Sequence, residues 1–269
     1  MKSELLGRKV KSTDYAYSLG RVSALEKYLL PSRYFREAAA LPTAKEAAHL
    51  LLETGRFTSS LDENFDRNDL DGFLQKEKDY LLQEMKNMML VPLIWSIYQQ
   101  EEKPEKALSL AWELGNEFIL SYLRLKIDLL NLKVISRGAY LALSEPQRES
   151  WLLPGGWLSG AQLNELQQRS FSEFGQVLEK TSYRDWWMRS YDFFKKEESF
   201  LALERESENL LIQKLREAKC YVFGPERVFA YAVARRHELK LFRLVVAGKL
   251  QQLPSEMIQT RISLTYVDG

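Results

Sequence analysis

The amino-acid sequence predicts an all-α protein. Several stretches place apolar residues at the i, i+3, i+7 spacing of one buried helix face. Residues that start or end helices flank many of these stretches. Runs that alternate polar and apolar residues, which would indicate strands, are scarce. The first clear helical stripe lies in segment 21–30 and consists of Val22, Leu25, Leu29 and Leu30.

Proline, threonine and glycine mark the first helix boundaries. Pro31 ends the helix over 21–30. Thr43 is a candidate N-cap, and Glu46 three residues later completes a capping box. Gly55 stands where the residue after a helix belongs, so a second helix is expected between Thr43 and Gly55. The polar segment 65–73 is interpreted as a connection.

Two longer segments in the middle of the chain are helical in composition. The first covers about 74–100, and Pro92 predicts a kink or break in it. The second covers 103–138 and is expected as one strongly helical stretch. Pro104 suits its first turn, and Gly138 suits the position after its end.

The C-terminal half continues the helical pattern after a loop over 152–163. Within that loop Ser159 is a plausible N-cap. Pro225 opens a helix that continues towards Gly248, where a C′ glycine with a basic last turn is expected. Further helices are expected over 171–183, 185–219 and 254–267.

Composition limits the classes of partner. The chain has 269 residues, 45% hydrophobic and 28% charged, with a net charge of +1. This near balance argues against a purely electrostatic partner such as nucleic acid or an acidic membrane. The N-terminus lacks the apolar core of a secretory signal, and the lone Cys220 fits a reducing compartment. The longest apolar run, 88–98, is too short to span a bilayer, so direct insertion is not expected.

An internal repeat is indicated at an offset of 110 residues. Segment 128–138 aligns with segment 238–248: both carry an acid, a base five residues later, an apolar run and a final glycine. A second similarity links 49–57 with 176–186, and the helix over 21–30 fits the same unit more weakly. The chain is therefore interpreted as three diverged helical repeats, with chance similarity between Leu-rich helices as the alternative. Their approximate bounds are 1–73, 74–188 and 189–269.

Motifs for catalysis or cofactor binding do not emerge. Gly155 and Gly156 lack the following Gly-Lys-Ser/Thr of a phosphate loop and are interpreted as a structural turn. His49 and His237 are far apart in sequence and lie outside any Cys/His cluster, so a metal site is not expected. Cys220 is interpreted as a buried or half-buried structural residue. The sequence therefore predicts no catalytic residue, no cofactor-binding residue and no metal site.

The C-terminal segment 223–267 resembles the C/d subunit of V-type and A-type rotary ATPases. Segment 128–138 with the following loop 152–159 resembles the middle repeat of that family, and 20–30 with 50–57 resembles the N-terminal one. The resemblance covers essentially the whole chain. Two departures are Arg236 and His237, which stand where members usually carry an acidic residue. The residues that carry the C-terminal resemblance are Phe223, Gly224, Pro225, Glu226, Glu238, Arg243, Gly248, Lys249 and Tyr266.

This resemblance implies a fold and a role. Members of the family are funnel-like, with three similar helical bundles around a pseudo-threefold axis. They are non-catalytic subunits of the central stalk, on the cytoplasmic side of the membrane. The expected partners are the central-shaft subunits (D/F type) and the membrane proteolipid ring, and the expected role is to transmit torque for ATP-coupled H⁺ or Na⁺ transport. A helical-repeat adaptor of an unrelated complex, or an enzyme with a cryptic site, are the alternatives.

Two groups of residues are candidates for a partner interface. The first is a basic cluster near one helix, interpreted as a solvated face or as a contact with acidic groups of the shaft or ring. The second is a pair of adjacent tryptophans. They are interpreted as part of the core, or with one of the two rings in contact with a partner. Because neighbours on a helix point about 100° apart, both can be buried only at a crowded junction. These candidates are Arg235, Arg236, Lys240, Arg243, Lys249, Trp186 and Trp187.

Overall fold

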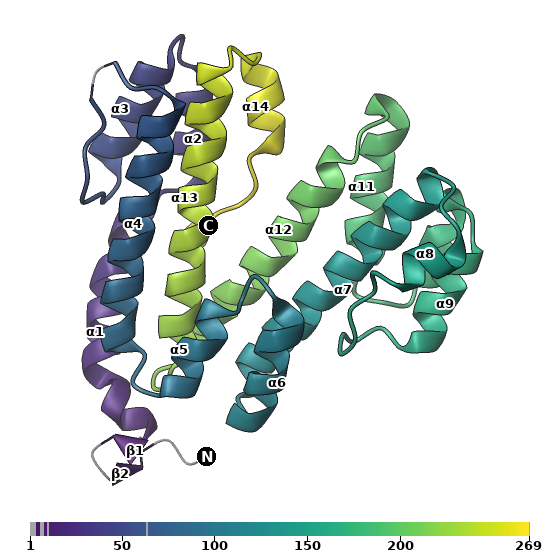
Figure 1. The fold of residues 1–269 in the computed structure, drawn as a ribbon, viewed down its shortest axis with the longest axis horizontal. Helices are drawn as coiled ribbons and strands as arrows, with labels where there is room; N and C mark the ends of the chain where they lie inside the picture. Colours follow the sequence, from purple (N-terminus) through teal and green to yellow (C-terminus); the bar gives the residue numbers. More distant parts are fainter. Residues whose placement is uncertain (1–3, 6–7, 10, 63, 269) are drawn as a thin grey trace. The chain divides into compact units, whose positions relative to one another are not determined.

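The computed structural model describes residues 4–5, 8–9, 11–62 and 64–268, and it confirms the all-α class (Figure 1). The chain divides into two compact units. Unit 1 comprises the residues up to Tyr98 together with those from Ile212 onward, and unit 2 comprises Gln99–Leu211. Strand structure in the described residues is confined to one antiparallel pair, β1 (Glu4–Leu5) and β2 (Arg8–Lys9).

Unit 1 packs around one long central helix, α13. This helix contacts α4 and α3 most extensively, and also α1, α2 and α14. Its sides are buried almost all round, as expected of a helix in the middle of a bundle. The helices of unit 1 are η1 (Ser12–Tyr15), α1 (Ala16–Leu25), η2 (Glu26–Tyr28), α2 (Ser32–Ala40), α3 (Ala44–Thr54), α4 (Arg67–Met88), α5 (Pro92–Gln99), η4 (Glu217–Cys220), α13 (Glu226–Leu250) and α14 (Ser255–Arg261).

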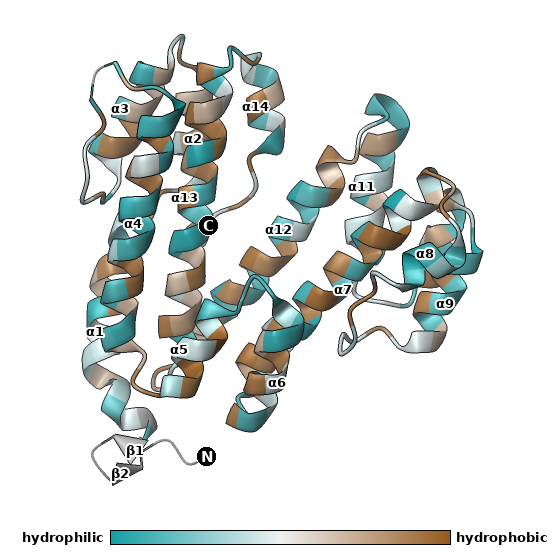
Figure 2. Ribbon diagram, in the orientation of Figure 1, coloured by the Kyte–Doolittle hydropathy of each residue, from teal (hydrophilic) through white to brown (hydrophobic). Residues whose placement is uncertain are grey.

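Unit 2 has a core of its own around the long helix α7. The core side chains of α7, such as Leu132 and Ile135, pack with apolar residues of α9–α12. Figure 2 shows hydrophobic residues at many levels along both α7 and α13. The helices of this unit are α6 (Pro104–Leu114), α7 (Glu117–Tyr140), α8 (Glu145–Glu149), α9 (Gly160–Gln168), η3 (Phe171–Glu173), α10 (Phe174–Leu178), α11 (Arg184–Glu197) and α12 (Leu201–Arg216), the last of which continues into unit 1.

The two central helices end in the same way, 110 residues apart. In each, the residue four positions after the glycine is left-handed without being glycine: Ala142 at φ 52° and Gln252 at φ 57°. The N–H five positions after the glycine donates to the glycine carbonyl, at 2.9 Å for Gly138 and 3.0 Å for Gly248. This is the bond pattern of a Schellman ending. The correspondence between segments 128–138 and 238–248 therefore extends to their backbone geometry.

Gly138 and Gly248 do not follow their helices, as the sequence suggested, but lie inside them. The reason is a close contact with the next short helix. A Cβ at Gly138 would lie 2.5 Å from Cδ of Arg148, and a Cβ at Gly248 would lie 2.9 Å from Cδ1 of Ile258. Arg148 and Ile258 are themselves 110 residues apart. Two segments are thus alike in detail, whereas a third copy and a threefold arrangement stay predictions.

Several predicted helix boundaries are confirmed. The capping box of α3 is formed: Thr43 Oγ1 accepts from the Glu46 N–H at 3.1 Å. Ser159 caps α9 in the same manner. Pro92 and Pro104 occupy the first positions of α5 and α6, and all four residues of the first apolar stripe are buried.

Other boundaries were wrong. The segment 65–73 is mostly helix, because Asp66 accepts from two N–H groups of the first turn and starts α4 at Arg67. The expected helix over 103–138 is two helices, separated by Gly115 at φ 68°. The expected helix over 185–219 is also interrupted, at Glu198 with φ 48°. Helix α2 was not expected at all.

The predicted boundaries between repeats fall inside helices. The boundary at 73/74 lies within α4 and the boundary at 188/189 lies within α11. The two units defined by contacts have different limits. The division into three repeats therefore stays a prediction about similarity between segments.

Candidate functional site

A buried charge network lies in unit 1, where α13 passes α4 and the loop after α3. Its centre is Arg235 on α13, with a side chain only 8% exposed. The guanidinium pairs with Glu238 (Nη1–Oε1, 2.7 Å) and lies 3.6 Å from Oε2 of Glu77 on α4. It also donates to the carbonyl oxygen of Arg56 and lies 4.6 Å from the centre of the Phe57 ring. Arg235 thereby ties together two helices and a loop.

The two carboxylates facing Arg235 differ in their other partners. Glu77 accepts from the N–H and O–H of Thr58, at 2.7 and 2.6 Å, and from the N–H of Ser59 at 2.8 Å. Glu238 is buried and accepts from the Arg235 guanidinium, whereas its second oxygen, Oε2, is buried without a hydrogen-bond partner. Burial raises the pKa of the Glu238 carboxyl, and Arg235 opposes this rise. These bonds offset part of the cost of placing charge inside the protein.

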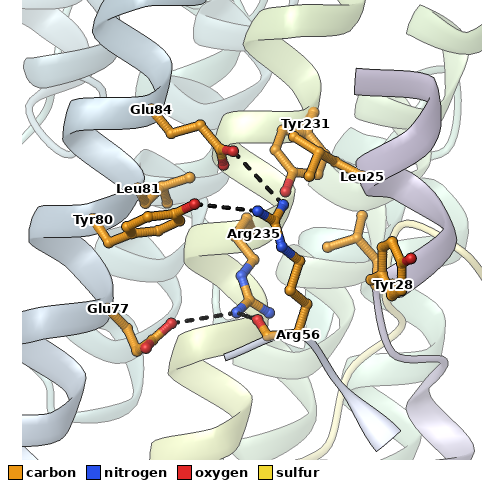
Figure 3. Close-up of a pocket in the computed structure, with 10 residues that line it drawn as sticks. Leu25, Tyr28, Arg56, Glu77, Tyr80, Leu81, Glu84, Tyr231 and Arg235 are labelled. Atoms are coloured by element: carbon orange, nitrogen blue, oxygen red, sulfur yellow. Dashed lines mark hydrogen bonds and ion pairs between the residues drawn. The ribbon is translucent and has the colours of Figure 1, made fainter. Parts of the chain in front are cut away.

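A second group of polar side chains continues the network along α4. Glu84 accepts a hydrogen bond from Arg21 of α1 at 2.8 Å and lies 3.6 Å from Nη1 of Arg56. Arg56 also donates to the hydroxyl of Tyr80 at 3.1 Å. Figure 3 shows Arg56 between Glu84 and Tyr80, with Arg235 and Glu77 below. Acidic residues on one face of α4 thus meet arginines from three other parts of unit 1.

These side chains line a small cavity. Its volume is about 20 Å³, and its walls include Leu25, Leu81 and Tyr231 as well as the charged groups. That volume holds about one water molecule, whereas metabolite pockets measure hundreds of Å³. The network is accordingly better suited to holding helices together than to binding a metabolite.

The five predicted basic residues do not form a single face of α13. At about 100° per residue, Arg236, Lys240 and Arg243 fall within about 60° of one another. Arg235 and Lys249 fall on a different side of the helix. The buried position of Arg235 contradicts its assignment to a solvated face; sequence proximity alone had grouped it with the others.

The remaining basic candidates are partly or fully exposed. Arg236 lies over the Tyr98 ring, 4.2 Å from its centre. Arg243 pairs with Asp71 of α4 at 2.9 Å, with both side chains about half exposed. Lys249 donates to Ser255 Oγ at 2.8 Å, and Lys240 is exposed. An exposed ion pair such as Arg243–Asp71 contributes little to stability, so Arg243 can pair with a partner's acid instead at low cost.

The two tryptophans belong to the core of unit 2. Trp186 and Trp187 are 0% and 1% exposed. The Trp186 indole N–H donates to Ser207 Oγ at 3.1 Å. The Trp187 ring stacks on Tyr191, with centres 5.4 Å apart, and meets Phe171 edge-on. The core interpretation therefore describes both rings, and neither is exposed to a partner.

Unit 2 has a buried carboxylate at the position equivalent to Glu238. Asp128 on α7 accepts from the N–H groups of Trp157 at 2.7 Å and Leu158 at 3.2 Å. The Tyr183 hydroxyl donates to it at 2.6 Å. Burial raises the pKa of the Asp128 carboxyl, although these donors act in the opposite direction. Both central helices thus carry a buried acid at equivalent positions: Asp128 binds backbone N–H groups of a loop, and Glu238 pairs with Arg235.

The glycine loop over 152–163 is a structural turn, as the sequence indicated. Gly155 adopts φ 95°, which favours glycine. A Cβ at Gly156 would lie 1.9 Å from Oδ1 of Asp128, so this position has no room for a side chain. Asn131 fixes the start of the loop through two bonds of 2.8 Å to the backbone of Leu153.

The sequence analysis singled out the acids at positions 128 and 238 but missed those of α4. Glu77 and Glu84 are seven residues apart on α4, and the apolar stripe of that helix includes Leu70, Leu74 and Leu81. Glu77 falls within this stripe, which is a recognisable signal of a buried charge. Cys220, in contrast, is exposed, which contradicts the expectation of a buried or half-buried residue.

In the described part of the chain, groups of three or more His, Cys, Asp or Glu that could hold a metal ion are not found. Within the same residues, every helix is too short or too polar to cross a bilayer.

The two helical units, each with buried charged side chains, define an all-α protein. Residues 105–261 match the family described as ATP synthase (C/AC39) subunit. The match covers more than half of the 269-residue chain, so the chain belongs to this family. A comparison with curated proteins gave no match.

Proposed function

We propose that the chain is a non-catalytic central-stalk subunit of a V-type or A-type rotary ATPase. In this role it is a socket that joins the rotating central shaft to the membrane proteolipid ring. It transmits torque for ATP-coupled H⁺ or Na⁺ transport from the cytoplasmic side, without entering the bilayer. The observation that carries the proposal is the family membership over residues 105–261.

The mechanical demand on such a socket can be estimated. Moving one charge through 100 mV involves about 2.3 kcal/mol, so several ions per nucleotide transmit on the order of ten kcal/mol. A nanomolar interface is worth about 12 kcal/mol. The energy transmitted per nucleotide is thus similar to the binding energy of the interface. The joint holds under such a load only if its parts keep their shape, so the subunit must resist deformation. Close-packed helices with buried charge pairs, such as Arg235 with Glu77 and Glu238, suit that requirement.

The partly exposed basic face of α13 is the proposed contact with acidic groups of the shaft or the ring. It consists of Arg236, Lys240 and Arg243, which share one side of the helix. Arg235 and the two tryptophans leave this set because they are buried. Charged groups at the edge of an interface mainly affect association rate and its dependence on salt.

The decisive experiment compares the complete ATPase with the same complex lacking this subunit. We expect ATP hydrolysis without ion pumping, or loss of the shaft from the ring, when the subunit is absent. ATP-driven pumping in vesicles and hydrolysis in solution are measured on the same preparation. Normal coupling in the complex without the subunit would show that it is not the torque-bearing joint.

A native pull-down with mass spectrometry separates this proposal from the adaptor alternative. Recovery of D/F-type shaft subunits together with the ring proteolipid supports the socket. Recovery of a defined complex without ATPase subunits supports the adaptor instead.

The basic face is tested by a double charge reversal, Lys240→Glu with Arg243→Glu. We expect weaker incorporation into the complex than for wild type, with the defect largest at low salt and smaller at raised salt, because salt screens the charges. The melting temperature of the free subunit should be nearly unchanged. A matched control reverses two exposed charges in unit 2, Lys180→Glu with Lys196→Glu. Equal incorporation of the two double variants would remove this face from the interface.

A further inference from the structure

Arg148 is a buried arginine without a partner. Arg148 is only 8% exposed, whereas the other residues of α8 are exposed. The Nε and Nη1 atoms are buried and lack a hydrogen-bond partner, and within the described residues the guanidinium makes no ion pair. Glu145 and Glu149, the acids of the same short helix, are exposed and do not pair with it. Such a charge is costly unless an anion compensates it.

The packing role of Arg148 does not require its charge. Its Cγ and Cδ atoms occupy the space over Gly138, where a Cβ would come within 2.6 and 2.5 Å. At the equivalent position of unit 1, Ile258 fills the space over Gly248. An apolar side chain therefore suffices for this contact. The guanidinium of Arg148 is an addition that the fold of unit 2 does not use.

Two large apolar side chains are exposed in the segments next to Arg148 and to the Gly138 that it contacts. Leu141, just after the end of α7, is 63% exposed, and Trp151 is 56% exposed. Trp151 is directly connected to α8, because its N–H donates to the carbonyl oxygen of Arg148 at 3.2 Å. Arginine and tryptophan are the residue types most enriched at energetic centres of protein interfaces. A guanidinium in a segment with exposed apolar side chains is suited to a carboxylate that is presented by an apolar segment.

We propose that the end of unit 2 formed by Leu141, Arg148 and Trp151 docks a segment of another ATPase subunit. That segment presents a carboxylate, from Asp, Glu or a chain terminus, beside apolar side chains. The carboxylate pairs with the guanidinium, and its apolar neighbours cover Leu141 and Trp151. The proposal rests on membership in an ATPase complex, and it is independent of whether the subunit acts as the socket.

The test uses Arg148→Met, which keeps an unbranched stem over Gly138 and removes the charge. The melting temperature of the free subunit should stay the same or rise, because a buried unpaired charge is removed. Incorporation into the complex should fall by about 30-fold or more, which is the usual effect of removing one member of a buried charge pair at an interface. Incorporation is measured by competition between the tagged variant and the untagged wild-type subunit for complex stripped of this subunit. Arg169→Met, at an exposed arginine paired with Glu165, is the control and should compete like wild type.

A photo-crosslinking residue at position 151 then identifies the partner in the assembled complex. Crosslinking to one ATPase subunit, and rescue of Arg148→Glu by reversing a carboxylate near the crosslink, would establish the docking. Equal competition by Arg148→Met and wild type would overturn it, as would a crosslink-free assembled complex. Destabilisation of free Arg148→Met without any loss of competition would also overturn it, by assigning Arg148 a purely internal role. Loss of coupling between ATP hydrolysis and ion pumping with normal docking of Arg148→Met would count against this docking site and leave the socket function intact. Loss of docking with normal coupling in the complexes that do assemble would support the docking site and count against the socket function.

Discussion

The replacement Arg235→Met tests whether the buried charge network holds unit 1 together. The variant keeps most of the side-chain volume but removes the guanidinium. Glu77 and Glu238 then stay buried without the cation that pairs with both of them. Both carboxylates are 3% exposed or less. Removing one partner of a buried ion pair costs about 3–5 kcal/mol, because the other charge stays buried and uncompensated. We expect a loss of that size in the free energy of unfolding.

The same helix offers a matched control. Arg243 pairs with Asp71 at 2.9 Å, but both side chains are about half exposed. Arg243→Met should therefore cost less than about 1 kcal/mol. The two variants make the same chemical change on α13 and differ mainly in burial.

Urea unfolding followed by circular dichroism at 222 nm measures the change. Tryptophan fluorescence is recorded in parallel because it reports mainly on unit 2, which contains every tryptophan of the chain except Trp95. Destabilisation of unit 1 should shift the dichroism midpoint at unchanged slope. If Arg235→Met and Arg243→Met lost the same stability within about 1 kcal/mol, the reasoning about burial would be refuted.

Three further predictions concern glycines and a buried acid. Gly156→Ala should cost about 2 kcal/mol or more in thermal or urea unfolding, because its Cβ would displace the Asp128 carboxylate from two N–H donors. Gly248→Val should lower the free energy of unfolding by about 1–3 kcal/mol through overlap with Ile258. Gly20→Ala, on an open helix surface, is the control and should be neutral or stabilising by up to about 1 kcal/mol. Equal effects of the two substitutions would contradict the contact argument. The folded-state pKa of Asp128 is raised, so its contribution to stability is full below the unfolded pKa of about 3.9 and is lost as pH rises through the higher folded value. The stability difference between wild type and Asp128→Asn should therefore shrink from pH 4 to pH 7, and a constant difference would argue against a raised pKa.

Local signals in the sequence predicted helix starts well. Thr43 with Glu46, Ser159, Pro92 and Pro104 each act within a few residues, so their effect is readable without tertiary structure. The start of α4 at Asp66 was missed, although its capping signal is also local. It caps α4 together with Asp69, but the polar composition around it suggested a loop.

Helix ends and interruptions were harder to predict because tertiary contacts decide them. Glu198 turns the chain with a left-handed conformation that neither glycine nor proline announces. Gly138 and Gly248 looked like helix ends, yet their helices continue because the glycines serve contacts with Arg148 and Ile258.

The candidate site was predicted by residue type and only in part by position. Helical periodicity could have separated Arg235 from Arg236 and Arg243, since it places them on different sides of α13. It could not show that Glu77 lies opposite Arg235, because that pairing depends on how two distant segments pack.

The contacts of Arg235 also fix the register of α13. One helical turn corresponds to about 5.4 Å along the axis, and a slip of α13 past α4 by that distance would separate the guanidinium from Glu77. Sliding by whole turns is the lowest-energy way for apolar helices to move past one another, because side chains re-enter equivalent grooves. The buried pair makes such alternative registers unfavourable. Under an axial force, unit 1 should therefore resist shear between its helices and transmit the load as a rigid body.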